Sequence, residues 1–273
     1  MDSKSHLESI KEKGFTVIKN ALQDDVVEKL ILKIRKISES HKNDFYPGFS
    51  NVRKKDKQIF NLQSKDVYFV KFLDILILNN ILESLLNDQN YRHNITKNYI
   101  LGELIARQSG DPLSLHIDSW MPSDGENTWM LQVAFVLEKR SANEGCTIIV
   151  PKSHRSGKFA KRDSKTFEKI EADKGDILIW DSRLWHGALP SDNSNWVIIA
   201  TFQRWWVKQR FDIPKTLEKK IFNKLSIEEK ILLGFASIPF FDELIGTDSR
   251  QGTENLLDWD KLNNLFHLSN GRN

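Results

Sequence analysis

The sequence has one cysteine, Cys146, in 273 residues. No internal disulfide can therefore form, and a reducing compartment is expected. Long apolar runs are also missing: the most apolar stretch, residues 69–86, is interrupted by charged and amide side chains that do not suit a lipid bilayer. No apolar segment follows the charges at the N-terminus, as an export signal would require. These features predict a cytoplasmic protein without a membrane partner.

An excess of charge of one sign is lacking as well. The 40 basic side chains are nearly balanced by 37 acidic ones, which leaves a formal net charge of +3. Without a clustered basic patch, so mild a surplus gives no reason to expect a nucleic-acid partner. The short basic runs at 53–55 and 208–210 are interpreted as solvated surface. We expect a small-molecule substrate, and the sequence does not fix the oligomeric state.

No internal repeat or low-complexity linker marks a domain boundary. With 40% hydrophobic residues, the chain is long enough for one large core. We expect a single domain over residues 1–273, with a helical N-terminal part (1–98), a β-rich core (99–207) and a helical tail (208–273).

The N-terminal part combines helical and strand patterns. Helices are predicted at 5–13 and 73–86, and a strand at 15–18. A third helix is predicted at 26–37 because Val27, Leu30 and Ile34 recur at helical spacing behind Asp24 and Asp25. The polar segment 42–65 is predicted to be a long loop.

From residue 99 the sequence changes to short β-rich segments separated by turn residues. Strands are predicted at 99–106, 113–117, 129–137, 147–150, 176–180 and 196–206. Many short strands with regular turns favour a mainly β fold with flanking helices, specifically a double-stranded β-helix, that is, a cupin-like jelly roll. Beyond it, helices are predicted at 214–225 and 226–233, the second with Ser226 as N-cap, and this tail is expected to cover one mouth of the barrel.

His116, Asp118 and His186 form the most informative pattern. Residues i and i+2 of a strand project to the same side, so His116 and Asp118 can converge if the strand that begins at 113 continues through Asp118. His186 follows an apolar strand, and a neighbouring strand could bring it beside the first pair. Two imidazoles and one carboxylate on one face of a ferrous ion leave the opposite face open, which is typical of oxygen-using iron enzymes.

Further motifs accompany the three residues along the chain. They are FTVIKNAL at 15–22, HID at 116–118, NEGCTIIVPKSHR at 143–155, GDIL at 175–178 and WHGA at 185–188. In this order they resemble the phytanoyl-CoA dioxygenase family, and WWVKQ at 205–209 is similar to the ending of some members. The resemblance implies a double-stranded β-helix that uses Fe(II), 2-oxoglutarate and O2. It also implies His116, Asp118 and His186 as catalytic metal ligands, and hydroxylation of a small metabolite or biosynthetic intermediate, with succinate and CO2 as co-products.

One departure from the family concerns the distal carboxylate of 2-oxoglutarate. Members usually carry an arginine about ten residues after the second metal histidine, because a guanidinium binds a carboxylate bidentately. Here residues 194–197 read SNWV, without a basic side chain. Arg204 is our predicted co-substrate anchor, with Arg107 and Lys97 as alternatives on a neighbouring strand.

Two further residues are candidates for ligand contact. Gln132 is polar within a predicted barrel strand and would contact the co-substrate if it faced inward, whereas exposure on the outer face is the alternative. Trp120 follows the metal-binding pair and is predicted to line the substrate pocket.

Three functions stay open from the sequence. The first is an Fe(II)- and 2-oxoglutarate-dependent dioxygenase that hydroxylates its substrate. The second is a non-catalytic metal-binding jelly-roll protein, which the missing arginine favours. The third is a cupin-like metal enzyme that does not use 2-oxoglutarate. Halogenation is not expected, because a halogenase leaves the carboxylate position open for halide and Asp118 fills it.

Overall fold

A computed structural model describes residues 3–40, 57–87, 97–108, 110–193, 195–237, 241–242, 247–248 and 259–260. The chain divides into two compact units. The first comprises residues 1–60 and 104–201, and the second comprises residues 61–103 and 202–273. No described helix is both long and apolar enough to cross a membrane.

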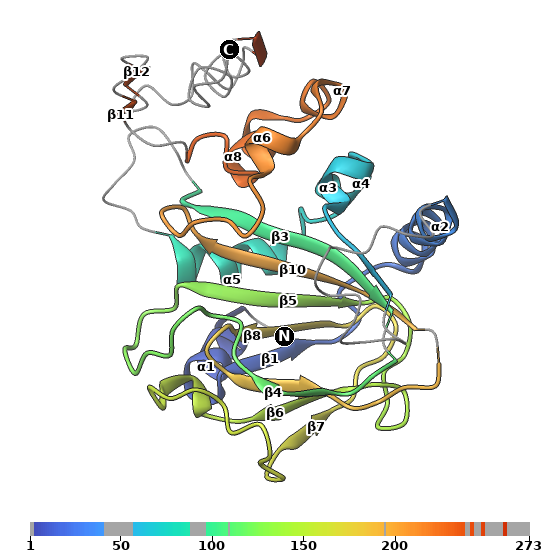
Figure 1. The fold of residues 1–273 in the computed structure, drawn as a ribbon, viewed down its shortest axis with the longest axis vertical. Helices are drawn as coiled ribbons and strands as arrows, with labels where there is room; N and C mark the ends of the chain where they lie inside the picture. The colour runs from blue at the N-terminus through green and yellow to red at the C-terminus, as the bar shows by residue number, and fades with distance from the viewer. Residues whose placement is uncertain are drawn as a thin grey trace. The chain divides into compact units, whose positions relative to one another are not determined.

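Two antiparallel sheets form the β-rich part (Figure 1). The six-stranded sheet has the order β1-β8-β5-β10-β3-β2 and the four-stranded sheet has the order β4-β9-β6-β7. The first contains β1 (Phe15–Ile18), β8 (Ile177–Asp181), β5 (Met130–Val136), β10 (Trp196–Arg204), β3 (Tyr99–Gln108) and β2 (Lys57–Ile59). The second contains β4 (Leu113–His116), β9 (Trp185–Ala188), β6 (Thr147–Val150) and β7 (Glu168–Ile170).

Along the chain, the strands from β3 to β10 cross repeatedly between the two sheets, four in each. This winding is that of a double-stranded β-helix, so the predicted fold class is confirmed. β1 and β2 are additional strands at the two edges of the larger sheet.

Apolar side chains fill the space between the sheets. One cluster joins Ala134 of β5, Leu178 and Trp180 of β8 and Val197 of β10 to Ile149 of β6. Because Ile149 belongs to the smaller sheet, the other four side chains face the interior. Each of the five is at most 5% exposed, so burial of apolar area holds the sheets together.

Helices flank the sheets in the first unit. α1 (Ser3–Lys13) precedes β1, and α2 (Asp24–Ser40) buries Val27, Leu30 and Ile34 completely, as their spacing predicts. Asp24 and Asp25 lie in the first turn of α2, where their negative charges interact favourably with the positive end of the helix dipole. A short 3-10 helix, η1 (Ser153–Arg155), follows β6.

The second unit holds the remaining elements. These are α3 (Leu62–Lys65), α4 (Tyr68–Lys71), α5 (Leu76–Leu86), α6 (Ile213–Thr216), α7 (Lys219–Phe222), α8 (Ile227–Leu232) and the two-residue strands β11 (Phe241–Asp242) and β12 (Thr247–Asp248). Ser226 caps α8, since its hydroxyl accepts from the backbone of Glu229, whose carboxylate accepts from the backbone of Ser226 in return. The predicted N-cap is confirmed, and the position of the tail over the barrel mouth stays a prediction.

Several predicted boundaries were wrong. The segment 42–65 is not one long loop: residues 41–56 lie outside the described part, but β2 and α3 occupy its second half. Ile59 and Leu62 are buried there, at 7% and 0% exposure, and these isolated apolar residues in a polar segment were too few to predict an element. The tail segment 214–225 forms two short helices rather than one.

Candidate metal centre

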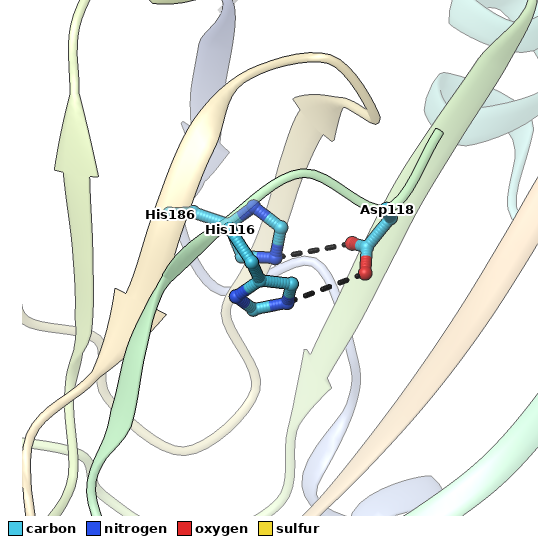
Figure 2. Close-up of side chains that lie close together, drawn as sticks. All are labelled: His116, Asp118 and His186. Carbon is cyan, nitrogen blue, oxygen red and sulfur yellow. Dashed lines mark ion pairs between the residues drawn. The ribbon is translucent and has the colours of Figure 1, made fainter. Parts of the chain in front are cut away.

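Two histidines and an aspartate come together where β4 lies beside β9. His116 is the last residue of β4, Asp118 follows two positions later, and His186 is the second residue of β9. His116 and His186 are cross-strand partners. Figure 2 shows the three side chains pointing toward one another. The structure thus brings together the three residues that the sequence singled out.

The donor atoms of these side chains are close. Nε2 of His116 lies 3.4 Å from one carboxylate oxygen of Asp118, and Nε2 of His186 lies 3.0 Å from the other. One ligand atom from each residue falls within 4.8 Å of the other two, and among the described residues this is the one group of three or more such side chains with that geometry. Two imidazole nitrogens and a carboxylate on one side are the donor set that a ferrous ion accepts in oxygenases.

Both imidazole rings are oriented by the backbone. Nδ1 of His116 is 3.0 Å from the carbonyl oxygen of Ser114, and Nδ1 of His186 is 2.9 Å from that of Leu184. Each Nδ1–H therefore donates to the carbonyl two residues upstream, which leaves Nε2 as the ring nitrogen that faces Asp118 and that would bind a metal. Hydrogen bonds of this kind fix the tautomer of metal-binding histidines.

The charges at the site reinforce one another. Burial opposes ionisation of Asp118, but attraction by His186 and hydrogen bonds from both imidazoles outweigh it and hold the pKa of Asp118 well below its usual range. Burial likewise acts to lower the pKa of His186, yet the charge and hydrogen bond of Asp118 raise it. Asp118 therefore stays ionised and can serve as an anionic metal ligand.

Asp118 is not part of the strand, contrary to the predicted geometry. β4 ends at His116, and the backbone N–H groups of Asp118 and Ser119 both donate to the carbonyl oxygen of Ser182, at 2.8 and 3.0 Å. The carboxylate is therefore placed by a turn that follows β8, rather than by the pleat of its own strand.

The 181–183 turn (Asp181, Ser182 and Arg183) is held by a buried ion pair. The guanidinium of Arg183 donates to both carboxylate oxygens of Asp181, each at 2.9 Å, and also to the carbonyl oxygen of Gly125 at 2.6 Å. The hydroxyl of Thr128 donates to Asp181 at 3.0 Å. This network ties the segment after Asp118 to the start of the His186 strand. The sequence motifs did not reveal this network, although the acid–base pair in DSR, one residue before WHG, was the signal.

Gly187, next to His186, allows β9 to approach β4 closely. A Cβ at this position would overlap the carbonyl oxygen of Leu113 and come within 3.2 Å of the carbonyl carbon of Ser114. We expect Gly187→Ala to lower the free energy of unfolding by about 3 kcal/mol, because the clash would be with backbone atoms, which cannot move aside as a flexible side chain can. Denaturant unfolding measures this. Gly125→Ala is the matched control, since its nearest atom would be at 3.4 Å, and equal losses in both variants would contradict the steric explanation.

The remaining predicted site residues differ in their surroundings. Gln132 on β5 is 5% exposed, and its side-chain oxygen accepts from the hydroxyl of Thr201 at 2.8 Å. It is the cross-strand partner of Trp180, whose side chain faces the interior, so Gln132 faces inward and the alternative of outer exposure was wrong. Trp120 is 68% exposed, two residues after Asp118.

The predicted anchor, Arg204, belongs to the second unit, whereas the metal-centre residues belong to the first. Its guanidinium donates to the carbonyl oxygen of Leu85 at 3.3 Å. Of the two alternatives, Lys97 places its charge near Glu228, where it helps lower the pKa of that carboxyl after the hydrogen bonds from the backbone and Ser226. The role of Arg204 as the co-substrate anchor stays a prediction.

The sequence matches the family described as phytanoyl-CoA dioxygenase (PhyH) over residues 10–195. The chain belongs to the phytanoyl-CoA dioxygenase family. The match spans the edge strand β1, the three converging side chains and the strands up to β9. The resemblance found in the sequence motifs is thereby confirmed.

Relatives agree with this assignment. The chain is 24% identical to Dioxygenase af480 of Aspergillus fumigatus over 251 residues, which is 88% of this chain and 78% of that protein. Its fold is similar to that of the epimerase SnoN in complex with Fe3+ and alpha ketoglutarate, with TM-score 0.61, 14% identity and coverage of 75% of this chain and 84% of the other. HygX from Streptomyces hygroscopicus with nickel and 2-oxoglutarate gives TM-score 0.60, 13% identity, and 77% and 90% coverage. At such identity these structures support the fold.

Phytanoyl-CoA dioxygenase family proteins are iron(II)- and 2-oxoglutarate-dependent oxygenases that use O2 and act on small molecules, and this chain is accordingly an oxygenase of that class. The donor set fits the metal. Two imidazole nitrogens, each on a ring oriented by a backbone carbonyl, and one carboxylate are a donor set that ferrous iron accepts, and the three atoms already lie within reach of one another.

Proposed function

We propose that the chain hydroxylates a small metabolite or biosynthetic intermediate, with His116, Asp118 and His186 as the catalytic ligands of the iron. The observation that carries this proposal is the convergence of three suitable donor atoms within 4.8 Å on adjacent strands. In the balanced reaction, one oxygen atom of O2 enters 2-oxoglutarate as it loses CO2 to become succinate. The other oxygen atom is inserted into a C–H bond of the substrate to give an alcohol.

Iron supplies the activation of O2 that breaks an unactivated C–H bond, and the protein supplies the geometry. His116 and His186 present Nε2 lone pairs because Ser114 and Leu184 hold the opposite ring nitrogens. Asp118 presents an anionic oxygen because the 181–183 turn fixes its backbone. A site whose ligands are oriented before the metal arrives loses little conformational entropy on binding.

The substrate side of the site is proposed to include Trp120. This side chain and its neighbour Met121 are 68% and 65% exposed, directly after Asp118 and Ser119. Large apolar side chains at such exposure beside a metal centre favour contact with an apolar part of the substrate. Gln132 and Arg204 are proposed as co-substrate contacts, Gln132 because it is polar and faces the interior of the β-helix.

Turnover can be tested directly. The purified protein with Fe(II), ascorbate and 2-oxoglutarate is expected to form succinate in air, slowly alone and faster when a small-molecule extract contains the substrate. With 18O2, we expect one labelled atom in succinate and a second in a product that has gained one oxygen. If succinate is labelled but the product has lost two hydrogens and gained no oxygen, the reaction is a desaturation and the proposed hydroxylation is wrong.

The non-catalytic alternative is favoured by one observation. At the start of β10, where a basic residue is expected, Trp196 and Val197 are both 3% exposed and apolar. Metal binding without succinate formation under any of the above conditions would support this alternative. Oxidation of a substrate by the iron form without 2-oxoglutarate would instead support the cupin-like enzyme.

A further inference from the structure

The positive charge of the chain is concentrated in the connection between β6 and β7 (residues 151–167). This connection contains six basic side chains and one acidic one, a net charge of +5, so the rest of a chain whose overall charge is +3 is slightly negative. All six cations are exposed: Lys152, Arg155, Lys158, Lys161, Arg162 and Lys165. None of them forms an ion pair with another residue in the described part of the chain. The nearly balanced composition therefore conceals a local excess of charge.

The β6–β7 connection begins beside the metal centre. β6 ends at Val150, which pairs with Trp185, and β4 ends at His116, which pairs with His186. Trp185 and His186 are the first two residues of β9. The β6–β7 connection and the connection between β4 and β5 (residues 117–129) therefore leave the smaller sheet at the same end, where the three metal-binding side chains meet.

Contacts of the backbone fix the start of the β6–β7 connection at this place. The indole N–H of Trp185 donates to the carbonyl oxygen of Lys158 at 3.0 Å. A Cβ at Gly157 would lie 3.4 Å from the Cβ of Asp124, so the β6–β7 connection passes directly beside the β4–β5 connection. The basic segment is thus adjacent both to the strand that carries His186 and to the segment that follows Asp118.

The same two connections carry exposed apolar side chains. Eight large apolar side chains are exposed among the described residues, and four of them lie here: Trp120, Met121 and Trp129 on the β4–β5 connection and Phe159 on the β6–β7 connection. Phe159 is 64% exposed and lies between Lys158 and Lys161 in the sequence. Single exposed apolar side chains are ordinary, but several of them beside unpaired cations favour a partner that is both apolar and anionic.

An anionic lipid surface has this combination of properties. Lysine and arginine side chains are attracted to acidic head groups, and exposed aromatic rings become buried at the boundary between head groups and acyl chains. A soluble anion or a nucleic acid would pair with the cations but would leave Phe159 and Met121 in water. Because the β4–β5 connection carries two exposed acids, Asp124 and Glu126, the attraction to such a surface is centred on the β6–β7 connection.

We propose that the β6–β7 connection docks the protein on an anionic membrane surface, with Phe159 in the interface and Lys158, Lys161 and Arg162 against the head groups. Because this connection begins beside the metal centre, docking brings the centre close to the bilayer, where apolar small molecules concentrate. Such a contact needs no helix that crosses the membrane. It is also independent of the reaction that the metal centre catalyses.

The test is sedimentation of the full chain with vesicles of phosphatidylcholine, with or without about 30% phosphatidylserine. The protein is expected to bind the anionic vesicles far more tightly than the neutral ones, and added salt should weaken this binding. The double variant Lys161→Gln/Arg162→Gln should lower the partition coefficient about 20-fold, since each cation near the surface contributes about fivefold. Phe159→Ala should lower it about tenfold or more, because the ring would no longer be buried in the interface.

Lys219→Gln/Lys220→Gln is the matched comparison. These adjacent cations are exposed but already paired, Lys219 with Asp260 and Lys220 with Glu218, so their loss should change the partition coefficient by less than about twofold. An unchanged midpoint of thermal unfolding shows that each variant is folded.

Three results would overturn the proposal. The first is equal binding to neutral and anionic vesicles, or none to either. The second is a normal partition coefficient in either variant of the β6–β7 connection, or an equal loss in Lys219→Gln/Lys220→Gln. The third is binding of inorganic phosphate, polyglutamate or an oligonucleotide that depends on Lys161 and Arg162 while vesicles do not bind, which would identify a soluble partner instead.

Discussion

Replacing Asp118 by alanine is expected to abolish metal-dependent turnover and to remove the stabilisation that a divalent metal gives the protein. Asp118 is the one anionic donor in the cluster, and each histidine contacts one of its oxygens. Loss of a residue that merely supports a ligand costs about 10- to 100-fold in affinity, so loss of a ligand should exceed about 100-fold. The measurements are succinate formation and the midpoint of thermal unfolding with and without Co(II) or Mn(II).

In the unaltered protein, metal at 100 times its Kd should stabilise by about 2.7 kcal/mol, or raise the unfolding midpoint by about 5 °C. Asp118→Ala should show no such shift. Asp124→Ala provides the matched control, because Asp124 is an exposed aspartate in the same connection. A variant lacking Asp118 that kept both the shift and turnover would remove this residue from the ligand set.

Replacing Arg183 by leucine is expected to be the most destabilising change outside the ligands themselves. The Arg183 and Asp181 side chains are 4% and 2% exposed, and removal of one partner leaves the other charge buried and unpaired. Such a loss costs about 3–5 kcal/mol, a large part of the 5–15 kcal/mol, roughly, by which a domain is stable. Because the 181–183 turn also holds the backbone of Asp118, metal affinity should fall as well, and urea unfolding and metal titration measure the two effects.

An exposed ion pair gives the comparison. Arg35 donates to Glu138 at 2.9 Å, but the Arg35 side chain is 57% exposed. Arg35→Leu should therefore cost less than about 1 kcal/mol and leave metal binding unchanged. If Arg183→Leu were as mild as Arg35→Leu, the buried pair would not be what orders the turn.

Much of the β-rich core could be predicted because its strands are short, apolar and separated by turn residues. The segment 147–150 was predicted to the residue, and 196–206 differed from β10 only at its end. β7 and β9 were not predicted as strands. Glu168–Ile170 is polar and mostly exposed, and Trp185–Ala188 contains a histidine and a glycine, so neither has a strand-like pattern. Their pairing with β6 stabilises them as strands, and this pairing cannot be predicted from the residues of each segment alone.

The metal cluster was accessible from sequence because its residue types are rare in combination and its spacing is short. What sequence reasoning could not supply was the support. The rule that alternate residues share a face was applied to Asp118, yet the chain leaves the strand after His116, and a turn distant in sequence sets the carboxylate. The strand that would bring a cation to the co-substrate could not be chosen either, because β3 and β10 become neighbours only in the folded sheet.

The edge strand β1 gives the amino-terminal segment a protective role. Phe15–Ile18 pairs along the whole outer side of β8 from Ile177 to Trp180, which shields a run of apolar β-strand whose backbone groups would otherwise face solvent. In a chain that lacks the residues up to Ile18, β8 would become an unpaired edge strand that can pair with strands of other molecules. Unpaired apolar edge strands promote aggregation. Truncation and fusion designs should therefore leave the first twenty residues in place.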